Sequence, residues 1–249
     1  MTAVRHVEHV MGTTVSLLAQ GPPDGRSRIE GAIAEAVDWL HEVDDRFTTY
    51  RPGSEWLSYC AGELPAVDLH TDMKHVLERT AELETETGGA FRVDADPGRP
   101  PDPAAYVKGW AVQGAADILV GSGASAVCVN GGGDVAAWRL RGSWRVGVQD
   151  PFDRTRVRAV LDVDCGAVAT SGAYERGDHV FDPRTGRPAH GLASVTVVGP
   201  DLGTADAYAT AAFALGREGP AWLRTLEGYG AYVVDDRGNA ESIGLAVAC

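Results

Sequence analysis

The sequence predicts an α+β protein in which helices surround an antiparallel sheet. Three stretches, residues 29–47, 72–88 and 108–119, carry apolar residues three or four positions apart, which is the period of an amphipathic helix. Between residues 126 and 169, short β-rich runs alternate with turn residues, a pattern typical of an antiparallel meander. No Pro/Ser-rich linker or charge block divides the 249 residues, so we expect residues 1–249 to form a single domain.

The chain begins with two predicted strands, Val4–Val10 and Thr13–Ala19. Between them stands Met11 followed by a glycine that permits a bulge or a close backbone approach; Met11 is equally compatible with a core position. The first long helix then leads into the loop Phe47–Glu55, where a Pro-Gly pair forces a turn. Tyr50 lies beside that pair, so we expect its ring at the edge of a cleft and not in the core.

Two further helices flank a proline-rich loop. Asp72 is the predicted N-cap of the first helix, and Gly88 ends it. The second helix is predicted to begin at Lys108, where a cation is unfavourable for the helix dipole. A solvated lysine is the ordinary explanation. The functional alternative is a cation directed at an anionic ligand.

Two later segments suggest a site. Residues Asn130–Asp134 contain three glycines, but a strand follows them, so the context excludes a dinucleotide-binding loop while still allowing a ligand to approach the backbone closely. The stretch Ala167–Pro188 mixes hydroxyl, histidine, carboxylate and arginine side chains with glycine and proline. This composition favours an ordered polar loop that forms a site; two hairpins with polar turns are the alternative.

The last part of the chain contains a candidate metal-binding helix. A strand at Ser194–Val198 precedes a helix with Thr204 as its predicted N-cap and Gly216 at its end. Asp206 and Thr210 are four residues apart and share a face of that helix. They are either two oxygen ligands for a hard cation such as Mg²⁺, or Asp206 only complements the positive end of the helix. A short helix, Pro220–Glu227, and strands at 231–234 and 241–243 follow.

Composition limits the possible partners. The net charge of −13 argues against nucleic acid and against anionic membrane surfaces. The four cysteines are widely spaced, which excludes a C-x-x-C metal or redox pair and a dense disulfide framework. The N-terminus lacks a secretory signal pattern, and no apolar run is long enough to span a bilayer, so we expect a soluble, cytoplasmic protein.

Eight short segments match the motifs of one known family in the order in which that family carries them. They are Met11–Thr13, Phe47–Glu55, Thr87–Phe91, Asp102–Ala111, Gly131–Asp134, Ala169–Gly172, His179–Gly186 and Ala205–Thr210. Each match alone is weak, but chance matches would not keep both composition and order. Together the segments resemble the FAD:protein FMN transferase (ApbE) family.

The resemblance implies one ApbE-like, T-fold-like domain that holds FAD extended in a cleft, with Mg²⁺ at its pyrophosphate. Enzymes of this family move the FMN half of FAD to a Thr or Ser hydroxyl of a target flavoprotein and release AMP; some members instead hydrolyse FAD to FMN and AMP. The matched motifs would place around the flavin nucleotide Met11, Tyr50, Gly89, Ala90, Phe91, Asp102, Lys108 and His179. The metal ligands would be Asp206, Thr210 and the main-chain carbonyl of Ala105.

The chemical step needs a group that accepts the proton of the acceptor hydroxyl. His179 is the best candidate for this base, because an imidazole with an unperturbed pKa of about 6.5 accepts a proton near neutrality. A structural histidine, hydrogen-bonded within its turn, is the alternative. Asp206 would act as a catalytic residue through the metal. The acceptor pattern Asp-Gly-x-Ser/Thr-Gly/Ala-Ala-Thr is absent from this chain, so we expect a separate acceptor protein.

Four positions depart from the family pattern. Arg92 replaces a common Asp, Ala105 a usual Gly, Gln113 a frequent Asp, and Ala209 a second carboxylate that some members carry on the metal helix. One fewer carboxylate weakens a Mg²⁺ site or leaves it dependent on bound phosphate. FAD hydrolysis and flavin binding without chemistry therefore stay open as second and third hypotheses.

Overall fold

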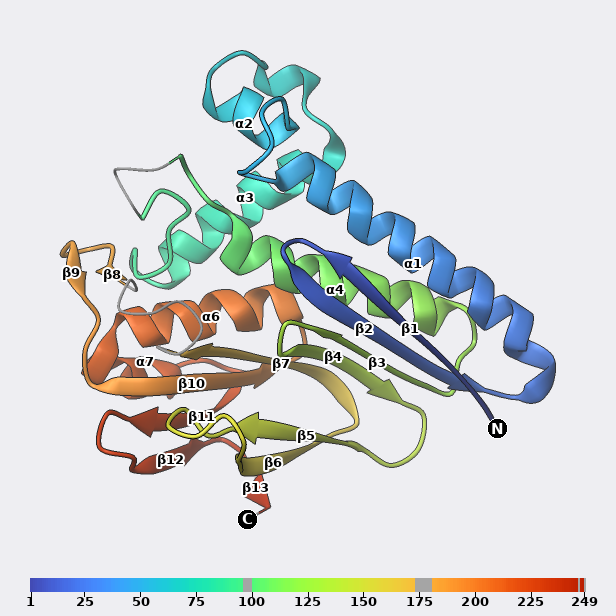
Figure 1. The fold of residues 1–249 in the computed structure, drawn as a ribbon. Coiled ribbons are helices and arrows are strands. Elements are labelled where there is room, and N and C mark those ends of the chain that lie inside the picture. The colour runs from blue at the N-terminus through green and yellow to red at the C-terminus, as the bar shows by residue number, and fades with distance from the viewer. Residues whose placement is uncertain (96–99, 173–180, 246, 249) are drawn as a thin grey trace.

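The computed structural model describes residues 1–95, 100–172, 181–245 and the backbone of 247–248. Its centre is a large antiparallel sheet with the strand order β1-β2-β3-β4-β7-β10-β11-β12. Helices cover one face of this large sheet, and a small sheet with the order β13-β6-β5 packs on the other, as Figure 1 shows. The strands are β1 Thr2–Val10, β2 Thr13–Gly21, β3 Ala126–Gly131, β4 Asp134–Arg139, β5 Trp144–Gln149, β6 Val157–Val163, β7 Cys165–Gly172, β8 Phe181–Asp182, β9 Arg187–Pro188, β10 Leu192–Gly199, β11 Gly230–Asp235, β12 Ala240–Ile243 and β13 Val247–Ala248.

The helices form a layer above the large sheet (Figure 1). They are α1 Arg26–Phe47, α2 Glu55–Cys60, α3 Thr71–Glu86, α4 Ala104–Gly121, α6 Leu202–Ala214 and α7 Gly219–Leu223. The predicted α+β class, with helices around an antiparallel sheet, is confirmed. No helix of the described residues is long and apolar enough to cross a membrane.

A tight turn joins the two N-terminal strands. The register pairs Val10 with Thr13, so Met11 and Gly12 form a two-residue hairpin turn. Both have positive φ, 54° and 68°, as a type I′ turn requires. A left-handed conformation is uncommon for a residue with a side chain as large as that of Met11. The predicted Met-Gly feature is therefore a strained turn, with the Met11 side chain packed against the core.

Helices α4 and α6 lie unusually close together. A Cβ atom added to Gly109 of α4 would lie 2.6 Å from the carbonyl oxygen of Leu202, and one added to Gly203 of α6 would lie 2.7 Å from the ring of Tyr106. Only glycine fits at such contacts. The crossing therefore brings the beginning of α4 against the beginning of α6, which carry the two predicted charged site residues.

Three predicted helix starts are wrong. The N-cap of α3 is His70, whose Nδ1 accepts from the Asp72 amide, and the N-cap of α6 is Asp201, whose side chain accepts from the Thr204 amide. Helix α4 begins at Ala104, so Lys108 lies in its second turn. In each case the helix begins earlier than predicted, because the residue His70, Asp201 or Pro103 stands at the N-cap. The final helix, predicted over residues 220–227, is the shorter α7.

The predicted meander is also wrong, because its strands divide between two sheets. Strand β4 pairs with β7, while β5 and β6 form a hairpin that folds onto the opposite face of the large sheet. A second, smaller hydrophobic cluster fills the space between the sheets, with Val135 and Val168 on one side and Val148 and Leu161 on the other. Burial of these two apolar faces against each other stabilises the split arrangement.

The stretch Ala167–Pro188 is not one polar loop. Its first six residues belong to β7 in the interior of the large sheet, and residues 181–188 form the β8–β9 hairpin. Residues 173–180 lie outside the described residues. The small residues of β7 favour a strand here because α6 packs directly on them: Ala167 and Ala169 are fully buried in the main core.

Candidate active site

A buried charged cluster joins α4, β4 and α6. The ammonium of Lys108 lies 2.6 Å from Oδ2 of Asp134 and 3.5 Å from Oδ2 of Asp206. Both carboxylate side chains are only 2% exposed, and the lysine side chain is 24% exposed. With both carboxylates ionised, the cluster carries one net negative charge in a low-dielectric setting. Such a charge favours the binding of a further cation.

Hydroxyl groups of β7 and α6 continue the cluster. The amide of Thr170 donates to Oδ1 of Asp134 at 2.9 Å, which fixes this carboxylate at the start of β4. The next residue, Ser171, places its Oγ 3.2 Å from Oγ1 of Thr210. Thr210 lies one helical turn after Asp206 on α6. The site is therefore rich in oxygen atoms.

The donor set fits a hard divalent cation such as Mg²⁺. Asp206 and Thr210 offer carboxylate and hydroxyl oxygens, and Ala105 lies one turn before Lys108 on α4. Among the described residues, no three His, Cys, Asp or Glu side chains come together as a metal site. An all-protein cage of that kind is more typical of zinc, whereas Mg²⁺ keeps several waters and takes one or two carboxylates plus substrate phosphate.

The segment Thr87–Phe91 is held rigidly after α3. The Thr87 hydroxyl donates to the carbonyl of Leu83 at 2.7 Å and accepts from the Phe91 amide at 3.0 Å. The side chains of Ala90 and Phe91 are buried in the core. They anchor the segment, so any contact with a flavin nucleotide would come from backbone atoms and from the position of Gly89.

The β8–β9 hairpin lies beside this segment. A Cβ at Gly89 would be 3.7 Å from Cγ of Arg184, whose guanidinium holds Asp182 at 2.8 Å. This hydrogen bond is the main cause of the lowered pKa of Asp182, which makes that carboxylate a poor proton acceptor near neutral pH. A cavity of about 420 Å³ between α3 and the end of α6 is lined in part by Gly88, Arg184 and Glu218.

The other predicted flavin residues lie on separate segments. The Tyr50 side chain is 91% exposed, which agrees with its predicted place outside the core. Asp102 is exposed, and its Oδ1 accepts from the Ala104 amide at the start of α4. His179 lies outside the described residues, so its predicted role as a base stays a prediction.

Two cluster members received no individual role in the sequence analysis. Asp134 follows three glycines and looks like an ordinary turn residue, although a carboxylate directly after a glycine-rich turn is a signal that could have been used. Ser171 belongs to a matched motif, but only the contact between α6 and β7 reveals its position beside Thr210.

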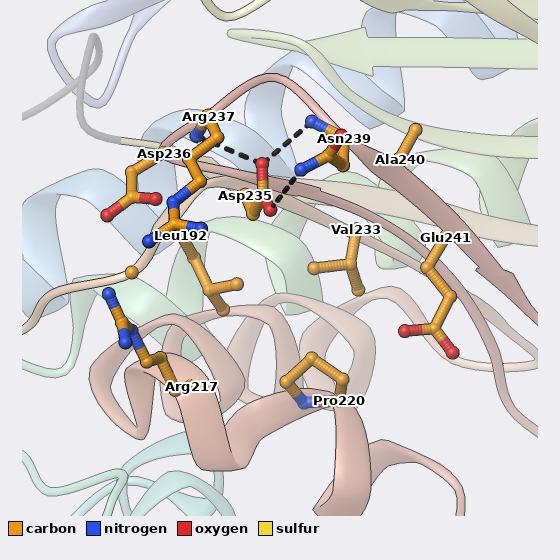
Figure 2. Close-up of a pocket in the computed structure, with 11 residues that line it drawn as sticks. Leu192, Arg217, Pro220, Val233, Asp235, Asp236, Arg237, Asn239, Ala240 and Glu241 are labelled. Atoms are coloured by element: carbon orange, nitrogen blue, oxygen red, sulfur yellow. Dashed lines mark hydrogen bonds between the residues drawn. The ribbon is translucent and has the colours of Figure 1, made fainter.

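A cavity of about 480 Å³ at the β11–β12 hairpin is a separate feature (Figure 2). Arg217, Arg237, Asp236 and Glu241 line it, and none of the described residues around it is a predicted site residue. Oδ1 of Asp235 accepts from the backbone amides of Arg237 and Asn239, which closes the hairpin turn. Because both basic and acidic side chains line it, this cavity does not define a charge preference.

The fold and the cluster together define a class of protein: an α+β domain with an oxygen-rich, partly charged site between a sheet and two closely crossing helices. A family model described as the ApbE family matches residues 11–99 and 94–233. The chain belongs to the ApbE family, as its motifs predicted.

Named relatives and solved structures agree with this membership. The FAD:protein FMN transferase of Escherichia coli K12 is 34% identical over 146 residues, which are 53% of this chain and 42% of that protein. That of Treponema pallidum is 34% identical over 167 residues, 58% of this chain and 46% of that protein. The matched stretch thus spans less than half the length of these relatives.

Two crystal structures share the fold. The ApbE protein of Thermotoga maritima superposes with a TM-score of 0.85 at 22% identity, covering 98% of this chain and 97% of that one. The flavin transferase ApbE of Vibrio cholerae superposes with a TM-score of 0.81 at 23% identity, covering 98% of this chain and 97% of that one. At these identities the likeness establishes the architecture.

Proposed function

We propose that this protein is a Mg²⁺-dependent FAD:protein FMN transferase. The observation that carries the proposal is the buried cluster of Lys108, Asp134 and Asp206, with Thr210 one turn away on α6. It combines a cation that suits a phosphate group with oxygen donors that suit a hard metal ion. The names of the curated relatives support the same activity.

The reaction exchanges one phosphorus–oxygen bond for another. The Thr or Ser hydroxyl of an acceptor flavoprotein attacks the FMN-side phosphorus of FAD, the bond to the bridging oxygen breaks, and AMP leaves with that oxygen. His179 accepts the hydroxyl proton. Lys108 orients the pyrophosphate and balances part of its charge. Asp206, Thr210 and the carbonyl of Ala105 would hold Mg²⁺, which supplies charge neutralisation at the phosphoryl oxygens when bound.

The position of the FAD follows from the motifs around the cluster. The rigid turn after α3 would contact the nucleotide through Gly89, with Ala90 and Phe91 anchoring it in the core. Met11, Tyr50 and Asp102 would complete the cleft. Tyr50 is suited to stacking on a ring because its side chain is free of the core.

The deciding experiment incubates the protein with FAD, Mg²⁺ and a peptide that carries the Asp-Gly-x-Thr-Gly-Ala-Thr pattern. The expected result is a peptide that gains the mass of FMN less water, together with one equivalent of AMP. Free FMN and AMP without a mass gain would assign FAD hydrolysis instead. Binding of FAD without either product would leave a flavin-binding protein.

A further inference from the structure

Strand β5 of the small sheet has an open edge. Within the described part of the chain β5 pairs only with β6, and the register from Trp144 to Val148 is regular, with a single irregularity at Gln149. The outer backbone groups of such an edge are available to pair with another extended segment. In Figure 1, β5 and β6 lie on the face of the large sheet opposite the helices.

A groove of about 390 Å³ follows this edge. One wall is β5, including Trp144, Arg145 and Gln149; the other is formed by Asn130 and by the turn Gly132–Gly133 between β3 and β4. The small sheet covers β4 and β7, but β2 and β3 beyond them stay partly uncovered at Leu18 and Cys128. Because paired strands lie about 4.8 Å apart, a strand added to β5 would lie over this uncovered face.

Two residues that line the groove adjoin Asp134 of the charged cluster. Thr170 lines the groove, and the amide of Thr170 donates to Asp134 of the charged cluster. Gly133 lines it too and is the residue directly before Asp134. A chain that occupies the groove therefore passes beside the cluster, which is the place where an acceptor hydroxyl has to arrive.

The charge of the groove differs from that of the whole protein. The chain carries a net charge of −13, yet Arg145 is the single charged side chain among the described residues that line the groove. Arg145 is exposed on β5. An extended segment with an acidic residue near its acceptor Thr or Ser matches both the open edge and this cation.

We propose that the acceptor protein docks by adding an extended segment to the free edge of β5, with an acidic side chain of the segment at Arg145 and the acceptor hydroxyl at the Gly133 end of the groove. This inference rests on the proposed function. It assigns the groove to the second substrate and leaves the FAD contacts as described above.

The test measures binding of a fluorescein-labelled Asp-Gly-x-Thr-Gly-Ala-Thr peptide to the full chain by fluorescence anisotropy, with FAD and Mg²⁺ present. Two further peptides are N-methylated at alternate residues, one at the odd and one at the even positions. Only every second amide of an added strand faces its neighbour. One methylated peptide is therefore expected to bind at least about tenfold more weakly than the other.

Protein variants locate the contact. Arg145→Glu is expected to weaken peptide binding about tenfold and Arg145→Lys to restore most of it, because the interaction is one of charge. Arg156→Glu makes the same charge change at an exposed position in the β5–β6 loop, outside the lining of the groove, and is expected to change the affinity less than twofold.

Equal binding of the two methylated peptides, equal effects of Arg145→Glu and Arg156→Glu, or no binding of the unmodified peptide would each overturn the docking proposal. FMN transfer is measured in parallel on the same samples. Transfer without the alternating pattern means that the enzyme proposal stands and the docking proposal fails. If the two methylated peptides differ in affinity and binding depends on Arg145, but no FMN is transferred and no AMP is released, the docking proposal stands and the enzyme proposal fails.

Discussion

Lys108 lies between two carboxylates that different elements bring to it. Asp134 is fixed by the amide of Thr170, so the lysine is held on the β4 side, and Asp206 approaches from α6. The ammonium balances only one of the two charges. Binding of a pyrophosphate adds further negative charge to the cluster, so we expect FAD affinity to depend on a divalent cation.

Removal of the Asp206 carboxylate tests that dependence. Asp206→Ala is expected to lower FAD turnover at least about a hundredfold, since it takes away the proposed charged ligand of the metal. Thr210→Ala is expected to be milder, because a water can replace a neutral hydroxyl. The readouts are AMP release against Mg²⁺ concentration and the thermal midpoint of each variant. An Asp206→Ala protein with unchanged magnesium dependence would show that Asp206 only serves the end of α6.

His179 is tested by substitution and by pH. His179→Ala is expected to lose about two to four orders of magnitude in FMN transfer, the usual contribution of one general base, while FAD still binds. Transfer rates are measured between pH 5.5 and 8, with FAD affinity followed by flavin fluorescence. A variant with a near-normal rate and an unchanged profile would remove His179 from the mechanism. The lowered pKa of Asp182 makes that carboxylate an unsuitable replacement.

At the scale of elements, the crossing of α4 and α6 sets the geometry of the cluster. Lys108 precedes Gly109, whose missing side chain lets α4 approach the backbone at Leu202. Asp206 follows one turn later on α6. A wider crossing would move the ammonium away from the carboxylate, so stability and activity are coupled at this contact.

Gly109→Ala is expected to destabilise the protein by roughly 1–3 kcal/mol and to reduce FAD turnover, because the added methyl group meets the Leu202 carbonyl at 2.6 Å. Gly31→Ala is the matched control: Gly31 is exposed on α1 and has nothing within 4 Å of the new methyl group. Gly31→Ala is expected to stabilise the protein by roughly 0.5–1 kcal/mol. Urea denaturation measures both. Equal effects of the two changes would exclude a tight crossing.

The same elements show what the sequence could predict. The apolar period identified α1 and α3 well, because each buries one face. It failed at the start of α4. This helix is buried on nearly all sides, so its apolar pattern does not show at which residue the helix begins. Strand partners were beyond reach as well. The local sequence does not indicate that β4 pairs with β7, because this pairing depends on how β5 and β6 cover the face of the large sheet opposite the helices.

The site divides in the same way. The sequence could single out Lys108, Asp206 and Thr210 as candidates, because the motif that contains each of them is local to its own helix, α4 or α6. The structure brings Lys108 and Asp206 together. Asp134 could not be assigned a role, because its meaning comes from the ammonium of α4 and the Thr170 amide of β7, both distant in sequence.

At the scale of the whole molecule, ionisable groups tie the helical layer together. Arg79 and Glu86 of α3 form a bidentate pair, Tyr208 of α6 donates to Glu86 at 2.8 Å, and Arg79 reaches the Thr204 hydroxyl. The Arg79 hydrogen bond is the main cause of the lowered pKa of Glu86, and burial is the main cause of the raised pKa of Tyr208. This contact connects the helix before the Gly89 turn with the helix that carries Asp206.

These shifts predict a stability plateau with two limits. A carboxyl whose pKa is lower in the folded state stabilises it above the unfolded value, which is 4.5 for Glu86, and this contribution is lost as the pH falls through the folded value. A phenol whose pKa is raised stabilises the folded state below its unfolded value of 10.0, and its contribution is lost as the pH rises above that.

The free energy of unfolding, measured with urea, is therefore expected to be nearly constant from about pH 6 to 9 and to fall below about pH 4.5 and above about pH 10. Glu86→Gln removes a carboxyl with a lowered pKa and should make the acid limb shallower while lowering stability at neutral pH. Tyr208→Phe should do the same to the alkaline limb. Glu63→Gln, at an exposed position before η2 (Ala66–Asp68), serves as the control. If Glu86→Gln and Glu63→Gln give the same pH profile, the contact between α3 and α6 does not contribute to the acid limit.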